Sequence, residues 1–157
     1  MSRLSLAALL GAAAAGLIGL GASRAQDTKS PSQPKGDAHS HHFMECAKAC
    51  DDCARTCEAC SSHCTRLVAD GKKDHLETVR SCQDCATVCA AASAITARGG
   101  PYADAICQAC ADVCKRCAEA CDKHPADMMM KRCADECRRC EKACRDMLAG
   151  ARAAAAR

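Results

Sequence analysis

The sequence predicts an all-α protein: an antiparallel four-helix bundle with a cysteine-lined core. The 157-residue chain contains 18 cysteines, and within each of four segments they recur at steps of only three or four residues. Such steps place side chains on one stripe of an α-helix. Large apolar side chains are too few for a conventional core, since only ten Leu, Ile, Val and Phe follow residue 25. Cysteine and alanine must therefore fill the interior.

The N-terminal part of the chain carries no cysteine. A basic residue, an apolar run and the small-residue end Ser23-Arg24-Ala25 are typical of a cleaved export signal over residues 1–25. A retained membrane anchor is the alternative. Residues 26–42 contain prolines, a glycine and scattered polar residues, and they are predicted to form a flexible tether. The sequence thus predicts export to the periplasm, with secretion as the alternative, and no stable membrane span after signal removal.

The remaining chain is predicted to form four helices of similar length joined by short loops. We expect the helices at about 43–70, 74–98, 101–123 and 126–149, so that the bundle domain spans 43–149 and is followed by a disordered tail over 150–157. Short connections between helices of similar length favour an up-down-up-down arrangement.

Turn residues mark the breaks between these helices. Gly71 suits a left-handed C-terminal cap, and Asp74 with Glu77 resembles an N-cap and its reciprocal partner. Gly99-Gly100-Pro101 separates the second and third helices, and His124-Pro125 separates the third and fourth.

Composition excludes several functions. The formal net charge is +3, two of those charges lie in the predicted signal, and the chain has one Phe, one Tyr and no Trp. Nucleic-acid binding is therefore not expected. No catalytic triad, phosphate-binding loop or carboxylate pair stands out, and Cys-x-x-Cys pairs recur along the helices instead of marking one activated thiol. We expect a protein that is not an enzyme.

Three explanations of the cysteines compete: buried packing, a disulfide or redox-buffering scaffold, and metal binding. Buried packing does not explain 18 cysteines on stripes. Disulfides between consecutive turns of one helix would close very short loops and add little stability. Thiolates are soft ligands that select Cu(I), zinc or iron–sulfur clusters. One Cu(I) per thiolate is neutral, whereas four thiolates around Zn(II) leave two buried negative charges, which favours many Cu(I) ions.

All 18 cysteines are candidate metal ligands. They are Cys46, Cys50, Cys53, Cys57, Cys60, Cys64, Cys82, Cys85, Cys89, Cys107, Cys110, Cys114, Cys117, Cys121, Cys133, Cys137, Cys140 and Cys144. This ladder resembles the copper storage proteins, a family of cysteine-rich four-helix bundles. The resemblance implies a core filled with many Cu(I) ions, storage instead of catalysis, a role in copper homeostasis and a homotetramer. Exported relatives often carry a twin-arginine signal, whereas this chain has only Arg3 near its start.

Further soft or nitrogen ligands converge on one end of the predicted bundle, where the first and third helices finish. They are His63, His75, His124, Met129 and Met130. The opposite end is predicted to be an apolar plug of Phe43, Ile95, Tyr102, Ile106 and Leu148. We therefore expect copper to enter and leave at the end that holds the histidines. A second group, His39, His41, His42 and Met44, adjoins the tether and gives only a weak signal of external metal capture.

Overall fold

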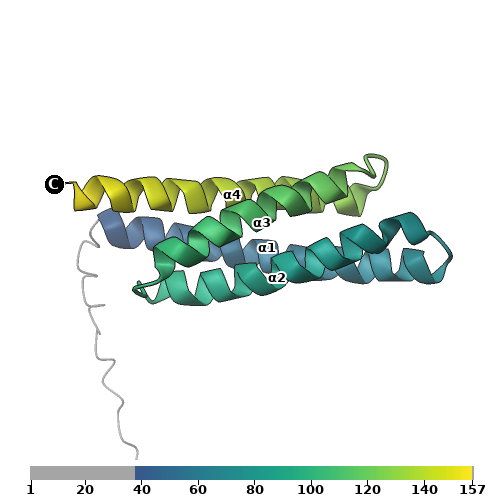
Figure 1. Cartoon of the computed structure of the whole chain (residues 1–157), viewed down its shortest axis with the longest axis horizontal. Coiled ribbons are helices and arrows are strands. Elements are labelled where there is room, and N and C mark those ends of the chain that lie inside the picture. Colours follow the sequence, from purple (N-terminus) through teal and green to yellow (C-terminus); the bar gives the residue numbers. More distant parts are fainter. Residues whose placement is uncertain (1–37, 157) are drawn as a thin grey trace, which may run out of the picture. The chain divides into compact units, whose positions relative to one another are not determined.

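The computed structural model describes residues 38–156, and this part of the chain is helical apart from its turns. The elements are α1 (Ala38–Ala69), the 3-10 helix η1 (Lys73–His75), α2 (Leu76–Ala97), α3 (Ala103–Asp122) and α4 (Met128–Ala155) (Figure 1). The predicted all-α fold is confirmed. The predicted export signal over 1–25 and most of the predicted tether lie outside the described residues.

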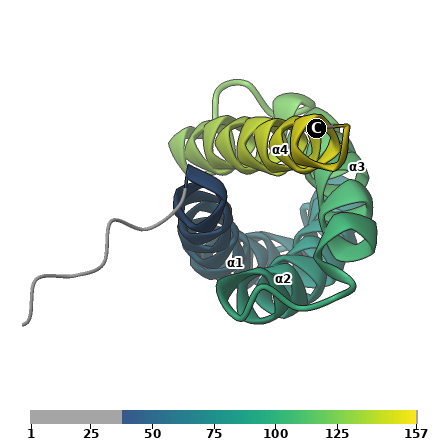
Figure 2. The ribbon, with the colours of Figure 1, turned by 90° about the vertical axis from the view of Figure 1, so that its left-hand side faces the viewer.

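The four long helices form an antiparallel bundle. Seen along its length, they follow one another around a ring in the order α1, α2, α3, α4 (Figure 2). Each helix packs against its two neighbours in the ring. Within residues 38–156, diagonally opposite helices have no Cα atoms within 8 Å of each other. The centre of the ring is therefore filled by side chains from all four helices.

Two glycines end helices as the sequence predicts. Gly71 follows α1 with φ of 91°, and Gly99 follows α2 with φ of 58°. The next amide in each turn bonds back to the helix, Lys72 N to Leu67 O at 2.9 Å and Gly100 N to Ile95 O at 3.0 Å. These are Schellman caps, in which a left-handed residue lets the chain satisfy the last free carbonyls. The two turns lie at opposite ends of the bundle.

The first and last helices, α1 and α4, are longer than predicted. α1 begins at Ala38, so residues 38–42 belong to the helix and not to a tether, and α4 continues to Ala155 through most of the predicted disordered tail. Neither stretch contains proline, and the added turns support each other. A Cβ placed on Gly150 would lie 3.6 Å from the His42 ring, and Ala151 packs against the core. Mutual packing extends both helices beyond the cysteine ladder.

The predicted cap of α2 is wrong. Residues 73–75 form η1, and α2 starts after His75 without a side-chain cap bond. Glu77 instead accepts hydrogen bonds at 2.8 Å from Lys123 at the end of α3. A residue that the sequence analysis did not single out caps α4: Asp127 accepts from the amides of Met129 and Met130 at 2.9 and 3.1 Å.

Cysteine and alanine fill the bundle interior. Every cysteine is at most 1% exposed, and the core contains alanines from all four helices, such as Ala54, Ala92, Ala111 and Ala134. Charged side chains lie outside and pair along the helices, as Lys48 does with Asp52 at 2.6 Å. Exposed pairs of this kind add little stability. Cohesion therefore depends on a core of small, polarisable side chains.

Candidate metal centre

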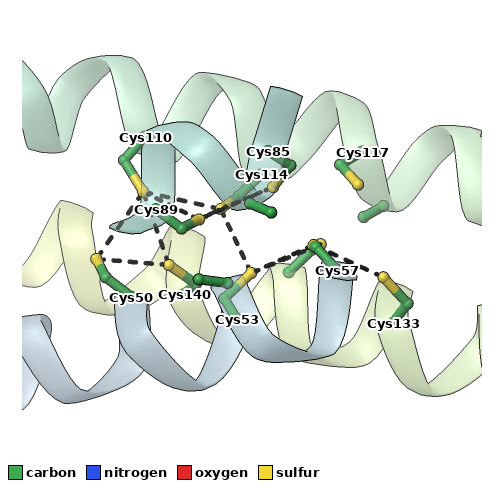
Figure 3. Packing of buried hydrophobic residues seen from close by; sticks show 14 of the residues in the cluster. Cys50, Cys53, Cys57, Cys85, Cys89, Cys110, Cys114, Cys117, Cys133 and Cys140 are labelled. Atoms are coloured by element: carbon green, nitrogen blue, oxygen red, sulfur yellow. Dashed lines mark hydrogen bonds between the residues drawn. The ribbon is translucent and has the colours of Figure 1, made fainter. Parts of the chain in front are cut away.

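A continuous column of thiols runs through the bundle. The cysteine stripes of all four helices face the centre, and in the middle of the bundle sulfurs of α1, α2, α3 and α4 point toward one another (Figure 3). The column begins near Cys64 at one end and finishes near Cys46 at the other. The sequence-predicted stripes are thus brought together as one site.

Neighbouring sulfurs lie close together without being bonded. Sγ–Sγ distances range from 3.5 Å for Cys89 to Cys114 to 3.9 Å for pairs such as Cys82 to Cys121. A disulfide requires about 2.05 Å, and all 18 cysteines are free thiols in this structure. Most of the close pairs join different helices. A metal that bridges such a pair ties two helices together.

The sulfurs form overlapping groups of four. In each group all Sγ atoms lie within 4.8 Å of one another. Examples are Cys50 with Cys110, Cys140 and Cys144; Cys53 with Cys57, Cys85 and Cys137; and Cys60 with Cys82, Cys121 and Cys133. Cys53, Cys57 and Cys133 each belong to more than one group. Shared members make this one extended site with bridging ligands, in contrast to a row of separate four-ligand sites.

Spacing and charge both favour a small monovalent ion. With a metal–thiolate bond of about 2.3 Å, as in zinc sites, three trigonal sulfurs lie about 4.0 Å apart and two opposed sulfurs about 4.6 Å apart. Small adjustments of the observed 3.5–3.9 Å spacings reach either arrangement. No lysine or arginine is buried among the described residues. Excess negative charge on a metal–thiolate cluster would therefore have no partner inside.

The thiols at both ends of the column are protonated near neutral pH. Burial, with the neighbouring Cys60 thiol, raises the pKa of Cys64 to about 12. For Cys107, the hydrogen bond with Cys144 lowers the pKa, but the hydrogen bond with Cys46 and burial outweigh it and raise the pKa to about 11. Thiolates are the metal-binding form, so each cysteine releases a proton when it binds metal.

Two histidine rings stack at the end where α1 and α3 finish, which we call the histidine end (His63, His75 and His124). His75 and His124 lie with ring centroids 4.0 Å apart. Asp74 lies on their outer side, 4.0 Å from His75 Nε2 and 3.9 Å from His124 Nδ1. Burial, reinforced by the neighbouring His124, lowers the pKa of His75, which favours its neutral, metal-binding form.

The inner nitrogen of His75 has no partner. The His75 side chain is 10% exposed, and its Nδ1 is the one buried side-chain nitrogen or oxygen without a hydrogen bond in the described part of the chain. Buried polar atoms are normally paired, so an orphan nitrogen needs an explanation. A lone pair that binds metal provides one.

His63 is held by a carboxylate. Its Nε2 lies 2.7 Å from Asp127 Oδ2, and burial of Asp127 is outweighed by hydrogen bonds from His63 and the Met130 amide that hold the Asp127 pKa below its usual value. A carboxylate on one nitrogen fixes the ring and leaves the other nitrogen for a ligand. Sequence reasoning missed Asp127; its position two residues after Pro125 was the available signal.

The methionines of the histidine end differ in burial. Met130 is fully buried beside the thiol column, and Met129 is partly buried against it. An open pocket of about 340 Å³ leads to this end and is lined by Leu67, Lys72, His75, His124, Pro125, Ala126 and Asp127. The sequence-predicted convergence of imidazoles and thioethers is present in the structure.

The opposite end, which we call the apolar end (Phe43, Ile106 and Leu148), is closed by packed side chains. Phe43 and Ile106 pack against the core, and Leu148 is buried. Tyr102 does not belong to the plug. It stands in the turn directly before α3, and its side chain is 72% exposed. Two residues that the sequence analysis missed, Met147 and Thr96, are fully buried here. Their positions on the helical stripes of α4 and α2 were the signal.

The second histidine group does not reach the thiol column. His41 and His42 are exposed, and so is Met44. His41 Nε2 lies 4.0 Å from the Glu45 carboxylate, on the outside of α1. The side chain of His39 lies outside the described set.

A four-helix bundle around one extended column of free thiols defines a protein that takes up many soft metal ions. The chain belongs to the copper storage protein family: the model of that family, described as "Csp: Copper storage protein", matches residues 38–149. The family that the sequence resembles is thereby confirmed. Comparison with curated proteins gave no match.

Solved structures of copper storage proteins are similar to this chain. A cytosolic copper storage protein from Streptomyces lividans, described with five coppers, is 36% identical to this chain. The match has a TM-score of 0.64 and covers 73% of this chain and 98% of the S. lividans chain. The S. lividans protein loaded with 10 copper equivalents is 34% identical with a TM-score of 0.64, covering 77% and 94%. Apo copper storage protein 3 from Bacillus subtilis is 31% identical with a TM-score of 0.57, covering 66% and 96%.

Proposed function

We propose that this protein stores many Cu(I) ions in the thiol column and releases them to other copper users or holds them to prevent toxicity. The observation that carries the proposal is the set of overlapping four-sulfur groups that spans the bundle. A chaperone or single-site carrier needs one such group. The S. lividans relatives described with five coppers and with 10 copper equivalents support multiple loading. Storage, and not catalysis, is the function of this family.

We assign all 18 cysteines as Cu(I) ligands. Each is buried in the column, and groups such as Cys60 with Cys82, Cys121 and Cys133 place thiols of different helices within reach of one ion. Loading exchanges thiol protons for monovalent ions and leaves the interior close to neutral. On this basis the capacity is on the order of one Cu(I) per cysteine.

An anaerobic titration of the reduced protein with Cu(I) tests storage. We expect binding to continue well past ten equivalents, with one proton released per thiol that binds. A plateau at one to four equivalents would contradict storage. Titration of the same sample with Zn(II) is the matched control, because buried charge limits zinc to fewer ions. Equal capacity for zinc would favour a general soft-metal store, and loss of free thiols without metal uptake would favour a redox buffer.

We also propose the histidine end as the route by which copper enters and leaves. His63, His75 and His124 bind Cu(I) less strongly than thiolates and suit a transit position, and Met129 and Met130 extend it toward Cys133. The orphan Nδ1 of His75 and the pocket at this end support the assignment. At the apolar end, none of the described histidine side chains is buried beside the column.

Transfer rates test the route. The triple variant His63→Ala, His75→Ala and His124→Ala should slow both loading and chelator-driven removal several-fold and leave the final capacity nearly unchanged. The matched control is His41→Ala with His42→Ala, which removes exposed imidazoles from the other end. If the control slows transfer and the triple variant does not, the route lies at the apolar end.

Export and assembly complete the proposal. The apolar run within residues 1–25 and its small-residue end support export to the periplasm. None of the helices within 38–156 is long and apolar enough to cross a bilayer. Cell fractionation with N-terminal sequencing tests export, and a mature chain that starts at Gln26 is expected. The family resemblance supports a homotetramer, and light scattering of the purified protein gives its mass.

A further inference from the structure

Six buried residues of α4, spaced at steps of three and four, all carry sulfur. They are Met130, Cys133, Cys137, Cys140, Cys144 and Met147, and none is more than 2% exposed. A thioether therefore stands at each end of a run of thiols. Met130 belongs to the histidine end, where the proposed route begins. Met147 lies at the apolar end, opposite the proposed route.

Three thiols finish the column at the apolar end. Cys46 Sγ lies 3.6 Å from Cys107 Sγ and 3.7 Å from Cys144 Sγ, so α1, α3 and α4 each supply one sulfur. Cys144 also lies 3.6 Å from Cys50 and joins this group to the rest of the column. The three sulfurs have the spacing of a three-coordinate Cu(I) site.

The remaining helix, α2, supplies no thiol at the level of Cys46, Cys107 and Cys144. The stripe of α2 continues beyond Cys89 with Ala92 and Thr96, both fully buried. The Thr96 hydroxyl lies 3.4 Å from Cys107 Sγ but donates its proton to the Ala92 carbonyl at 2.6 Å. A hydroxyl oxygen is a hard ligand that Cu(I) does not favour. Any fourth donor for the terminal ion must come from another helix.

Met147 is placed to be that donor. It follows Cys144 by three residues on the same stripe, is 2% exposed, and packs in the same buried cluster as the cysteines. A thioether is a soft ligand without charge, so it adds a donor and leaves the charge balance of the site unchanged. Phe43, Ile106 and Leu148 already supply apolar packing at this end of the bundle.

We infer that Met147 Sδ, with the thiolates of Cys46, Cys107 and Cys144, forms a terminal Cu(I) site that closes the column at the apolar end. The inference rests on the proposed storage function and adds a ligand to it. The thiolates are shared with neighbouring Cu(I) ions of the column, as Cys144 is through Cys50, so one proton leaves for each ion bound, and the thioether has no proton to lose.

Methionine methyl NMR tests the inference in the full chain. The protein is labelled with [methyl-¹³C]methionine, and spectra are recorded during anaerobic titration with Cu(I). The chain has six methionines, so the methyl signals are few. The Met147 signal is identified by its absence from the spectrum of Met147→Leu. We expect the Met147 methyl signal to move to a new position in slow exchange on loading. The signal of Met44, which is 54% exposed near the same end, should stay.

Metal retention gives a second readout. Met147→Leu conserves volume, so the bundle should persist, and Met44→Leu is the matched control. With increasing chelator, the loaded Met147→Leu protein should lose one equivalent at a concentration at least about tenfold lower than the wild type does, as expected for a weakened metal site. Normal loading with an unmoved Met147 signal and unchanged retention would overturn the inference and leave storage intact. Failure to load several equivalents would overturn storage itself.

Discussion

The two ends of the bundle share the thiol column but differ in what surrounds it. At the histidine end, imidazoles, two carboxylates and an open pocket adjoin the last thiols. At the apolar end, Phe43, Ile106, Met147 and Leu148 pack over them. Both ends bury their cysteines equally well. The difference therefore lies in access and in the kind of ligand, and it supports the proposed copper route.

This asymmetry separates holding metal from moving it. Ligands that exchange quickly are useful only where metal meets solvent, and the described histidines near the column all lie at one end. At the other end, the side chains are buried, and the thiols of Cys46, Cys107 and Cys144 have thiol neighbours on other helices. A store needs both regions: a column that retains metal along its length and one end at which retention is relaxed.

The largest expected effect is on the stability of the whole column. In the proposed loaded state, Cu(I) links neighbouring helices along the column, and even one site at about 1,000-fold excess metal over its Kd adds about 4 kcal/mol. We expect Cu(I) loading to raise the melting temperature by about 10 °C or more, and chelator removal of copper to reverse the rise. Hydrogen exchange should slow in the layers of Cys64 and Cys107 alike. Equal melting temperatures for apo and loaded protein would contradict this.

The second effect concerns pH and tests whether the thiols at both ends are protonated in the folded apo protein. Burial is the main cause that raises the pKa of Cys64 to about 12, and the Cys107 thiol is raised to about 11; an unfolded cysteine has a pKa of about 8.5. The folded state therefore binds protons more tightly, and this stability is complete below about pH 8.5 and is lost as pH rises toward the folded values. The apo protein should melt several degrees lower at pH 10 than at pH 8.

Loaded protein provides the control for that measurement. Metal-bound thiolates have no proton to lose, so the melting temperature of the loaded protein should change little between pH 8 and pH 10. A parallel decline in apo and loaded protein would point to surface charges as the cause.

The helices and the column could be predicted from sequence because one residue type marks the buried stripe. Where tertiary contacts decide, prediction failed. Asp74 and Glu77 fit a local cap, but the stacking of His75 on His124 and the Glu77–Lys123 pair draw the segment into η1. Asp127 caps α4 and holds His63 at once, a role that depends on a neighbour distant in sequence.

The ends of α1 and α4 were missed for a related reason. Polar residues before Phe43 and the Ala/Arg tail carry no stripe of their own, and they are helical because each packs on the other. Met147 was missed because its signal, one more step of the α4 stripe, is visible only when methionine is counted together with cysteine. On α4, the residues that recur at steps of three and four share a sulfur atom, and not only a thiol group.

A matched pair of leucines compares the packing of the two ends. Leu148 at the apolar end is 8% exposed, and Leu76 at the histidine end is 42% exposed. Leu148→Ala should lower the free energy of unfolding of the apo protein by about 2–4 kcal/mol, whereas Leu76→Ala should cost about 0.5 kcal/mol. Chemical denaturation measures both. Equal costs would mean that the apolar end is not the better-packed one.

The smallest expected difference between the two ends lies in their turns. Gly71 and Gly99 both have positive φ, and a Cβ at either would meet no atom within 4 Å. Alanine there has only the backbone penalty, about 1–2 kcal/mol in the left-handed region. Gly71→Ala and Gly99→Ala should therefore lower apo stability by similar amounts and leave the rate of chelator-driven copper removal unchanged.

Gly150→Ala is the control of opposite sign: this glycine lies within α4, the new Cβ would meet the His42 ring at an ordinary 3.6 Å, and alanine should stabilise the helix by about 0.8–1.0 kcal/mol. If Gly71→Ala alone changed the removal rate, the turn beside the histidines would take part in copper transfer. Transfer at the histidine end would then depend on backbone geometry as well as on the ligands there.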